Sequence, residues 1–177
     1  MASATTIPSQ TLAITHHRTN AIMSRRLIPD DTRIQFVKQM TKHTFTNPAT
    51  VYEALCTPGS MRIITPHRLD GHKDLAQLGD AALRLILTKD GYQAHATRGQ
   101  INNTHSSKAS NAFLARTGFQ KGLDRYLYVN PSQGGTVSDK VMATTVEAIL
   151  GAVYIDSGEN IQAVRSVVAE LGLAWPA

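Results

Sequence analysis

The chain has 177 residues, of which 42% are hydrophobic and 18% are charged, a composition typical of one folded domain and not of a disordered chain. No apolar run approaches the roughly 20 residues that a membrane-spanning helix needs, and the single cysteine, Cys56, excludes an intramolecular disulfide and a cysteine-based zinc cluster. The net charge of +5 and the isoelectric point near 9.6 favour polyanionic partners such as RNA, although many basic proteins bind no nucleic acid.

The first 31 residues differ in composition from the rest. No acidic residue precedes Asp30, and several basic residues lie there among many Ser and Thr: His16, His17, Arg18, Arg25 and Arg26. This is typical of a mitochondrial import segment, with a solvated tail as the alternative. We therefore expect a disordered or targeting tail at 1–31, a domain at 32–173 and a C-terminal tail at 174–177. The expected location is intracellular, either in mitochondria or in the cytoplasm or nucleus.

Three helices are predicted in the first half of the domain. The apolar residues of Thr32–His43 share one broad face, and Asn47-Pro48 is typical of a helix start, with Thr57-Pro58-Gly59 as the end of that helix. The strongest pattern lies at His72–Asp90, which Gly91 is expected to end. Its buried face is predicted from steps of three and four residues: Leu75, Leu78, Ala82, Leu85 and Ile86.

The middle of the domain is less regular. A helix that carries Phe113 is expected to begin at Ser106 or Ser107 and to end at Gly118. The turn-forming residues of 130–135 predict a loop. Four basic or titratable residues are expected on polar loops: His95, Arg98, His105 and Lys108.

The end of the domain is again strongly helical. Ser138–Asp156 begins with a plausible N-cap and has an apolar stripe of four residues: Met142, Val146, Ile149 and Val153. Gly158 separates it from a last helix at Glu159–Leu171, which Gly172 ends. Because no long stretch alternates with period two, the sequence predicts an all-α fold.

Two acids interrupt otherwise apolar helices. Asp80 follows Leu78-Gly79, and Glu147 follows Thr144-Thr145-Val146. A carboxylate within an apolar stripe is costly unless it is paired or binds a metal ion. The alternative is a carboxylate at the edge of its helix that is hydrogen-bonded to Ser, Thr or a backbone amide.

Three segments resemble the ribonuclease III family. Residues 75–83, Leu-Ala-Gln-Leu-Gly-Asp-Ala-Ala-Leu, resemble the family signature, whose usual form is Leu-Glu-Phe-Leu-Gly-Asp. Residues 110–116, Ser-Asn-Ala-Phe-Leu-Ala-Arg, are similar to its Gly-Asn-x-x-Leu-Ala element. Residues 142–157, Met-Ala-Thr-Thr-Val-Glu-Ala-Ile-Leu-Gly-Ala-Val-Tyr-Ile-Asp-Ser, resemble its second acidic helix most closely. The three motifs follow the family's order between Phe36 and Leu173, which makes the resemblance specific.

The resemblance implies a ribonuclease III-like helical fold and an endoribonuclease that cuts double-stranded RNA as a homodimer, using Mg²⁺ (or Mn²⁺) held by carboxylates. It also implies the site residues: Glu147 as the principal metal ligand and Asp80 as the holder of a metal-bound water. Such an ion activates water and stabilises the leaving oxygen. Lys108 and Arg116 are weak candidates for RNA contacts.

The sequence departs from the family in its acids. Ala76 and Thr144 stand where the family has two further acids, and Lys73 stands where it often has another. Asp74 lies about 100° further round the helix, which makes it a poor substitute. Two acids instead of four predict weak metal binding. Gln77 replaces the aromatic residue that plugs the partner subunit in this family, so we expect an altered dimer contact.

Two functions therefore stay open. One is a metal-dependent endoribonuclease for double-stranded or structured RNA. The other is a non-cutting relative that binds RNA or belongs to a mitochondrial ribosome. The missing acids favour the second, and retention of Asp80 and Glu147 favours the first. A separate double-stranded RNA-binding domain is not expected, because the sequence ends at Ala177. A generic helical interaction domain would explain the composition but not the three ordered motifs.

Overall fold

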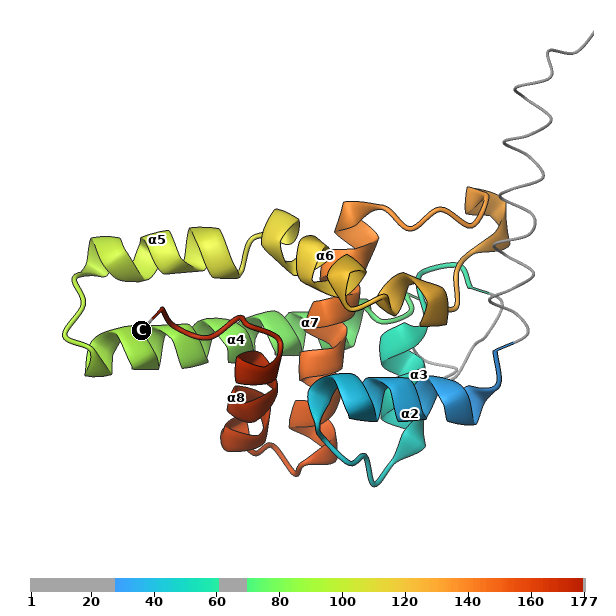
Figure 1. Cartoon of the computed structure of the whole chain (residues 1–177), viewed down its shortest axis with the longest axis horizontal. Helices are drawn as coiled ribbons and strands as arrows, with labels where there is room; N and C mark the ends of the chain where they lie inside the picture. The colour runs from blue at the N-terminus through green and yellow to red at the C-terminus, as the bar shows by residue number, and fades with distance from the viewer. Residues whose placement is uncertain (1–27, 61–69, 177) are drawn as a thin grey trace, which may run out of the picture.

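The computed structural model describes residues 28–60 and 70–176, and these residues form an all-α fold (Figure 1). Its helices are α2 (Asp30–Thr41), α3 (Pro48–Leu55), α4 (Lys73–Gln93), α5 (Arg98–Lys108), α6 (Asn111–Gln120), α7 (Asp139–Asp156) and α8 (Ile161–Glu170), with 3₁₀ turns η1 (Leu123–Tyr126) and η2 (Pro131–Gln133). The tail expected at 1–31 lies outside the described residues up to position 27. None of the described helices is long and apolar enough to cross a membrane.

Helix α7 is the centre of the fold. Helices α3, α4, α6 and α8 all pack against it (Figure 1), so it is buried on most of its circumference, as its high apolar content requires. The four residues of the predicted stripe are all buried, which confirms the stripe. Ser138 caps the helix as expected, because its hydroxyl accepts a hydrogen bond from the Val141 amide at 3.3 Å.

Helices α4 and α7 approach each other closely enough for their backbones to touch. A Cβ atom added to Gly79 would lie 1.8 Å from the carbonyl oxygen of Glu147, and one added to Gly151 would lie 2.0 Å from that of Leu75. Only glycine fits at these two positions, because any side chain would overlap the backbone of the other helix. The crossing point of the two helices is therefore fixed by Gly79 and Gly151.

Two glycines expected to end helices lie inside them instead. Helix α4 continues past Gly91 to Gln93, and a Cβ atom on Gly91 would lie 2.7 Å from the side chains of Ile101 and Trp175. Gly118 lies within α6, and a Cβ atom there would lie 2.4 Å from Met142 Sδ. The expected helix ends were wrong, because these glycines provide room for neighbouring side chains and do not turn the chain.

Helix α5 was not predicted, and the residues expected on polar loops at 98–108 lie on it. Only Thr104 of this helix is buried, so the helix has no apolar periodicity. Its start is marked by a capping box in which Thr97 and Gln100 exchange side chain-to-backbone hydrogen bonds of 2.7 and 3.3 Å. The expected cap at Ser106 or Ser107 was wrong as well, since Ser110 caps α6.

The buried face of α4 also differs from the prediction at two leucines. Leu78 and Leu85 are 39% and 57% exposed, and Tyr92, seven residues further on, is 79% exposed. The buried positions are instead Leu75, Ala76, Gly79, Ala82, Leu83, Ile86, Leu87 and Gly91. The helix packs on α7 through the face centred on Gly79, which turns Leu78, Leu85 and Tyr92 outward in one line. We call these three residues the α4 stripe.

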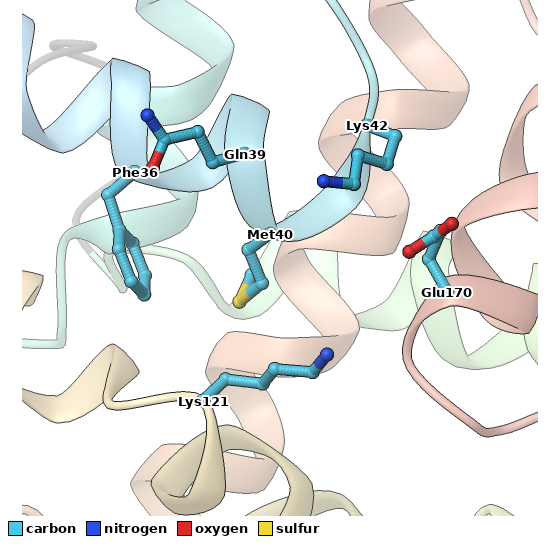
Figure 2. Close-up of a pocket in the computed structure, with 6 residues that line it drawn as sticks. All are labelled: Phe36, Gln39, Met40, Lys42, Lys121 and Glu170. Atoms are coloured by element: carbon cyan, nitrogen blue, oxygen red, sulfur yellow. The ribbon is translucent and has the colours of Figure 1, made fainter.

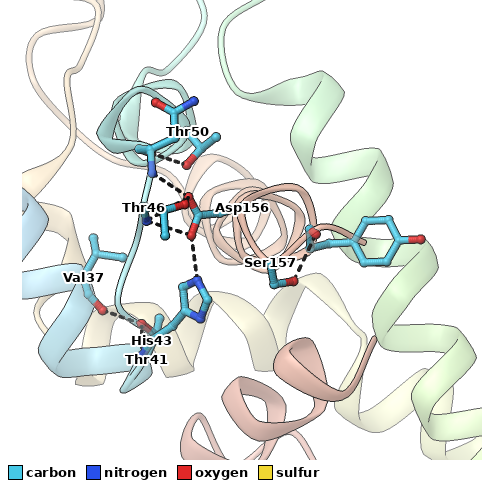
Figure 3. Close-up of polar contacts among 9 residues, drawn as sticks. Val37, Thr41, His43, Thr46, Thr50, Asp156 and Ser157 are labelled. Carbon is cyan, nitrogen blue, oxygen red and sulfur yellow. Dashed lines mark hydrogen bonds and ion pairs between the residues drawn. The ribbon is translucent and has the colours of Figure 1, made fainter. Parts of the chain in front are cut away.

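The C-terminal end of α7 is tied to the segment before α3 by Asp156 (Figure 3). Its carboxylate accepts hydrogen bonds from the backbone amides of Asn47, at 2.7 Å, and Thr46, at 3.0 and 3.1 Å, and lies 3.0 Å from His43 Nε2. Burial favours the neutral acid, but these hydrogen bonds outweigh it and hold the pKa of Asp156 below its usual value. Asp156 thus has a structural role away from Asp80.

The α4–α7 contact predicts opposite effects for two Gly→Ala substitutions. Gly79→Ala should lower the free energy of unfolding by about 2–4 kcal/mol, because the new methyl group overlaps the backbone of α7. Gly99→Ala in α5 should raise it by up to about 1 kcal/mol, because the added Cβ meets nothing closer than 3.8 Å and alanine favours the helix. Urea unfolding of both variants measures the difference, and equal effects would contradict the backbone contact.

Candidate active site

The crossing of α4 and α7 brings the two acids of the sequence analysis within electrostatic reach of each other. Asp80 directly follows Gly79, whose backbone lies against the Glu147 carbonyl group. Both side chains are half-buried, and the charge of Asp80 acts on Glu147. The structure thus places Asp80 and Glu147 in one cluster, while their roles as catalytic or metal-binding residues stay predictions.

The environment of Glu147 favours its neutral form. Burial is the largest cause, and the negative charge of Asp80 adds to it, while Arg84 acts in the opposite direction. Together they raise the pKa of Glu147 from 4.5 to about 7. Near neutral pH this acid is therefore protonated in a substantial fraction of molecules.

Asp80 has a partner that the sequence analysis missed. Arg84, one helical turn further along α4, places its Nε atom 2.8 and 2.9 Å from the two carboxylate oxygens of Asp80. The Asp80 and Arg84 side chains are 34% and 48% exposed. An Asp followed four residues later by Arg on a helix is a spacing that pairs such side chains, so this partner could have been found from the sequence.

The positions of the replaced acids supply little to a metal ion. Ala76 is buried one turn before Asp80, and Thr144 is half-buried on α7. The Nζ atom of Lys73 lies 3.6 Å from Oδ1 of Asp70, and Asp74 is exposed. Within residues 28–60 and 70–176 no group of three His, Cys, Asp or Glu side chains is arranged to hold a metal ion. The Mg²⁺ site implied by the family resemblance therefore does not fit the side chains present.

A buried histidine at the start of α4 was also missed. His72 Nε2 lies 3.1 Å from the Thr145 hydroxyl, which itself donates to the Val141 carbonyl oxygen at 2.8 Å. The hydroxyl therefore accepts from Nε2–H. Burial is the largest cause that lowers the pKa of His72, and the charge of Lys73 acts in the same direction, while the Val141 backbone opposes both. The resulting pKa is about 4. His72 is thus neutral at pH 7, and it anchors the start of α4 to α7.

The two candidate RNA contacts lie on other helices. Lys108, at the end of α5, donates to the Gly172 carbonyl oxygen at 3.1 Å, and its Nζ atom lies 4.8 Å from the centre of the Phe113 ring. Its side chain is thus engaged within the protein. Arg116 is exposed on α6. Neither belongs to the cluster of Asp80 and Glu147, and their contact with RNA stays a prediction.

A pocket of about 280 Å³ lies away from the acids (Figure 2). Residues near the end of α2 line it together with the ends of α6 and α8: Phe36, Gln39, Met40, Lys42, Lys121 and Glu170. The two lysines belong to the C-caps of α2 and α6, where positive side chains are favoured by the helix dipole. This pocket holds neither Asp80 nor Glu147 and is not part of the candidate site.

Comparison with known proteins agrees with this geometry. The family description "Ribonuclease III domain" matches residues 73–158, which span α4 to α7. The chain contains a ribonuclease III-type domain. The nuclease domain of ribonuclease III from Campylobacter jejuni has the same fold, with a TM-score of 0.67 and 17% sequence identity over 78% of this chain and 94% of that one. The predicted fold is thereby confirmed.

Three curated relatives are ribonucleases 3 from bacteria. The chain is 31% identical over 125 residues to that of Vibrio campbellii, covering 66% of this chain and 53% of the relative. It is 34% identical over 103 residues to ribonuclease 3 of Shewanella woodyi, which covers 55% of this chain and 43% of the relative. It is 29% identical over 111 residues to ribonuclease 3 1 of a Nostoc species, which covers 60% of this chain and 49% of the relative. The chain spans about half the length of the curated relatives it matches.

The raised pKa of Glu147 predicts a pH-dependent effect of Glu147→Gln. A carboxyl group with a higher pKa in the folded state stabilises the fold fully below its unfolded pKa, and this contribution is lost as the pH rises from 4.5 through about 7. Glutamine does not titrate. When the pH is raised from 5 to 8, the free energy of unfolding of the variant should therefore rise relative to that of the wild type by on the order of 1–3 kcal/mol. Urea unfolding at both pH values checks this, and a pH-independent difference would argue against it.

Proposed function

We propose that this protein binds double-stranded or structured RNA through its ribonuclease III-type domain and has lost the metal-dependent cleavage. The observation that carries the proposal is the composition of the cluster at the α4–α7 crossing. The two helices keep Asp80 and Glu147 together, but Ala76 and Thr144 take the places of the other acids, and Arg84 binds Asp80. The helical framework is thus retained with a reduced set of ligands.

The reduced set weakens the binding of a hard divalent ion. Mg²⁺ requires about six oxygen ligands, and protein sites usually supply them through carboxylates together with water. If each lost carboxylate costs about 10-fold in affinity, a magnitude known for changes around metal ligands, two losses cost about 100-fold. Protonation of Glu147 near neutral pH lowers the affinity further, because only the ionised carboxylate is a good ligand.

Cleavage of RNA is the second candidate function. It is favoured by one observation, the electrostatic coupling of Asp80 and Glu147 on two separate helices. Phosphate oxygens of a bound RNA would add ligands that the protein lacks. Membership of a mitochondrial ribosome is a variant of the non-cutting proposal. It depends on the acid-poor segment 1–31, which lies mostly outside the described residues.

The distribution of charge limits the affinity that we expect for RNA. All 13 acidic residues lie in the described part of the chain, together with 13 of the 18 basic residues, so that this part is neutral. The five remaining basic residues are Arg18, Arg25, Arg26, Arg62 and Arg68. Because the affinity for nucleic acid and its salt dependence both grow with the number of neutralised phosphates, we expect a modest affinity for RNA that decreases with salt.

An RNA assay tests the two functions together. Long double-stranded RNA mixed with the full chain in EDTA should be retarded on a gel at about 50 mM salt and released near 200 mM. With Mg²⁺ or Mn²⁺, the wild type should cut no more RNA than Glu147→Gln. Cutting by the wild type alone would establish the nuclease instead, and RNA that is not retarded at low salt would refute the RNA-binding proposal.

The proposed assembly is a homodimer that uses the α4 stripe. Leu78, Leu85 and Tyr92 recur every seven residues on an exposed helix face, a spacing typical of helix–helix contacts. Gln77, where the family resemblance places an aromatic plug, is also exposed on α4. In the Campylobacter jejuni nuclease domain, a structurally flexible region is involved in dimer formation. These observations support a dimer in which leucine and tyrosine replace the plug.

The dimer proposal predicts a position-specific effect of a charge. Leu85→Lys should raise the dimer dissociation constant by about 10- to 30-fold, as expected for loss of an apolar anchor. Ile155→Lys makes the same kind of change at another exposed apolar residue, 43% exposed on α7, and should leave it unchanged. Sedimentation equilibrium measures both. A monomeric wild type at high micromolar concentration would contradict the proposal.

A further inference from the structure

The cluster at the α4–α7 crossing contains its own cation. We infer that the Arg84 guanidinium takes the place of a divalent ion at this site, because it binds the Asp80 carboxylate at the crossing of α4 and α7. The inference rests on the proposed function, because it gives the reason why a ribonuclease III-type domain can keep this pair of acids after losing the others.

The geometry places the positive charge of Arg84 on the carboxylate of Asp80. The Nε atom of Arg84 lies within 2.9 Å of each carboxylate oxygen of Asp80, so both oxygens already have a charged donor. Asp80 directly follows Gly79, whose backbone lies against the Glu147 carbonyl group, so this ion pair lies at the crossing of the two helices. The guanidinium therefore occupies a carboxylate that a divalent ion at this crossing would need.

The net charge of the cluster supports the same conclusion. With all three side chains ionised, Asp80, Glu147 and Arg84 together carry a charge of −1. A bound divalent ion would make the net charge of this half-buried cluster positive, which is unfavourable. The four acids of the family pattern would instead leave such an ion with an excess of negative charge around it.

The alternative is an ordinary surface ion pair. Arg84 is 48% exposed, and an exposed pair at this helical spacing changes a folding equilibrium by only about twofold. Its removal should therefore leave the fold intact, which makes Arg84 a clean position for a test. The two explanations predict different effects of an Arg84 substitution on the affinity for a metal ion.

Mn²⁺ is the probe, and its binding to the full chain is measured by calorimetry and by the loss of the free-ion electron paramagnetic resonance signal. The titration is made in the background Ala76→Glu/Thr144→Asp, which restores the two missing acids. Adding Arg84→Ala should tighten Mn²⁺ binding by about 10-fold or more, because a positive charge a few ångströms from the ion is removed. Lys89→Ala is the matched control. Lys89 is exposed on the same helix, roughly 13 Å along its axis from Asp80, and its removal should change binding by about twofold or less.

A second pair of variants avoids the buried position 76. In the otherwise unchanged chain, Arg84→Glu and Lys89→Glu make the same change of charge on exposed sites, and Arg84→Glu should bind Mn²⁺ about 10-fold more tightly than Lys89→Glu. Equal affinities within either pair would overturn the inference, as would an Ala76→Glu/Thr144→Asp chain that binds Mn²⁺ equally tightly with and without Arg84→Ala. Because no RNA is present, this outcome is independent of the RNA retardation that tests the proposed function.

Discussion

The direct contact between the backbones of α4 and α7 is the constraint on which the rest of the fold depends. Gly79 and Gly151 permit this approach, since a Cβ atom on either would lie within about 2 Å of a carbonyl oxygen on the other helix. The close crossing leaves α7 surrounded by α3, α4, α6 and α8, and α7 carries more residues of the buried apolar core than any other described helix. Helix α7 thereby becomes the axis of the domain, and its apolar sequence is explained by its position.

The same contact determines the chemistry available at the crossing. It brings Asp80 within electrostatic reach of Glu147, and both burial and the charge of Asp80 disfavour the ionised form of Glu147. The structure meets this cost in two ways. Glu147 takes a proton more readily than usual, and Arg84 neutralises Asp80. Ala76, buried one turn before Asp80, removes a third charge and packs as a small apolar residue.

The residues that maintain the fold are separate from those that a metal-dependent nuclease would need. Asp156 ties the end of α7 to the segment before α3, and His72 anchors the start of α4 through Thr145. None of these contacts involves Ala76 or Thr144. The helical framework of a ribonuclease III-type domain is thus compatible with a changed acid set, because packing at the crossing requires small residues and not carboxylates.

The sequence alone determined the all-α class, the two acidic helices, the N-cap of α7 and the resemblance to ribonuclease III, because these depend on local periodicity and on short motifs. It did not determine α5, a helix with no apolar stripe, or the internal positions of Gly91 and Gly118, because a glycine that makes room for a neighbour looks the same in sequence as one that ends a helix. Only the tertiary structure decided that Leu78 and Leu85 face outward and that Arg84, Asp80 and Glu147 share one cluster, since the rotation of α4 about its axis is fixed by its contact with α7.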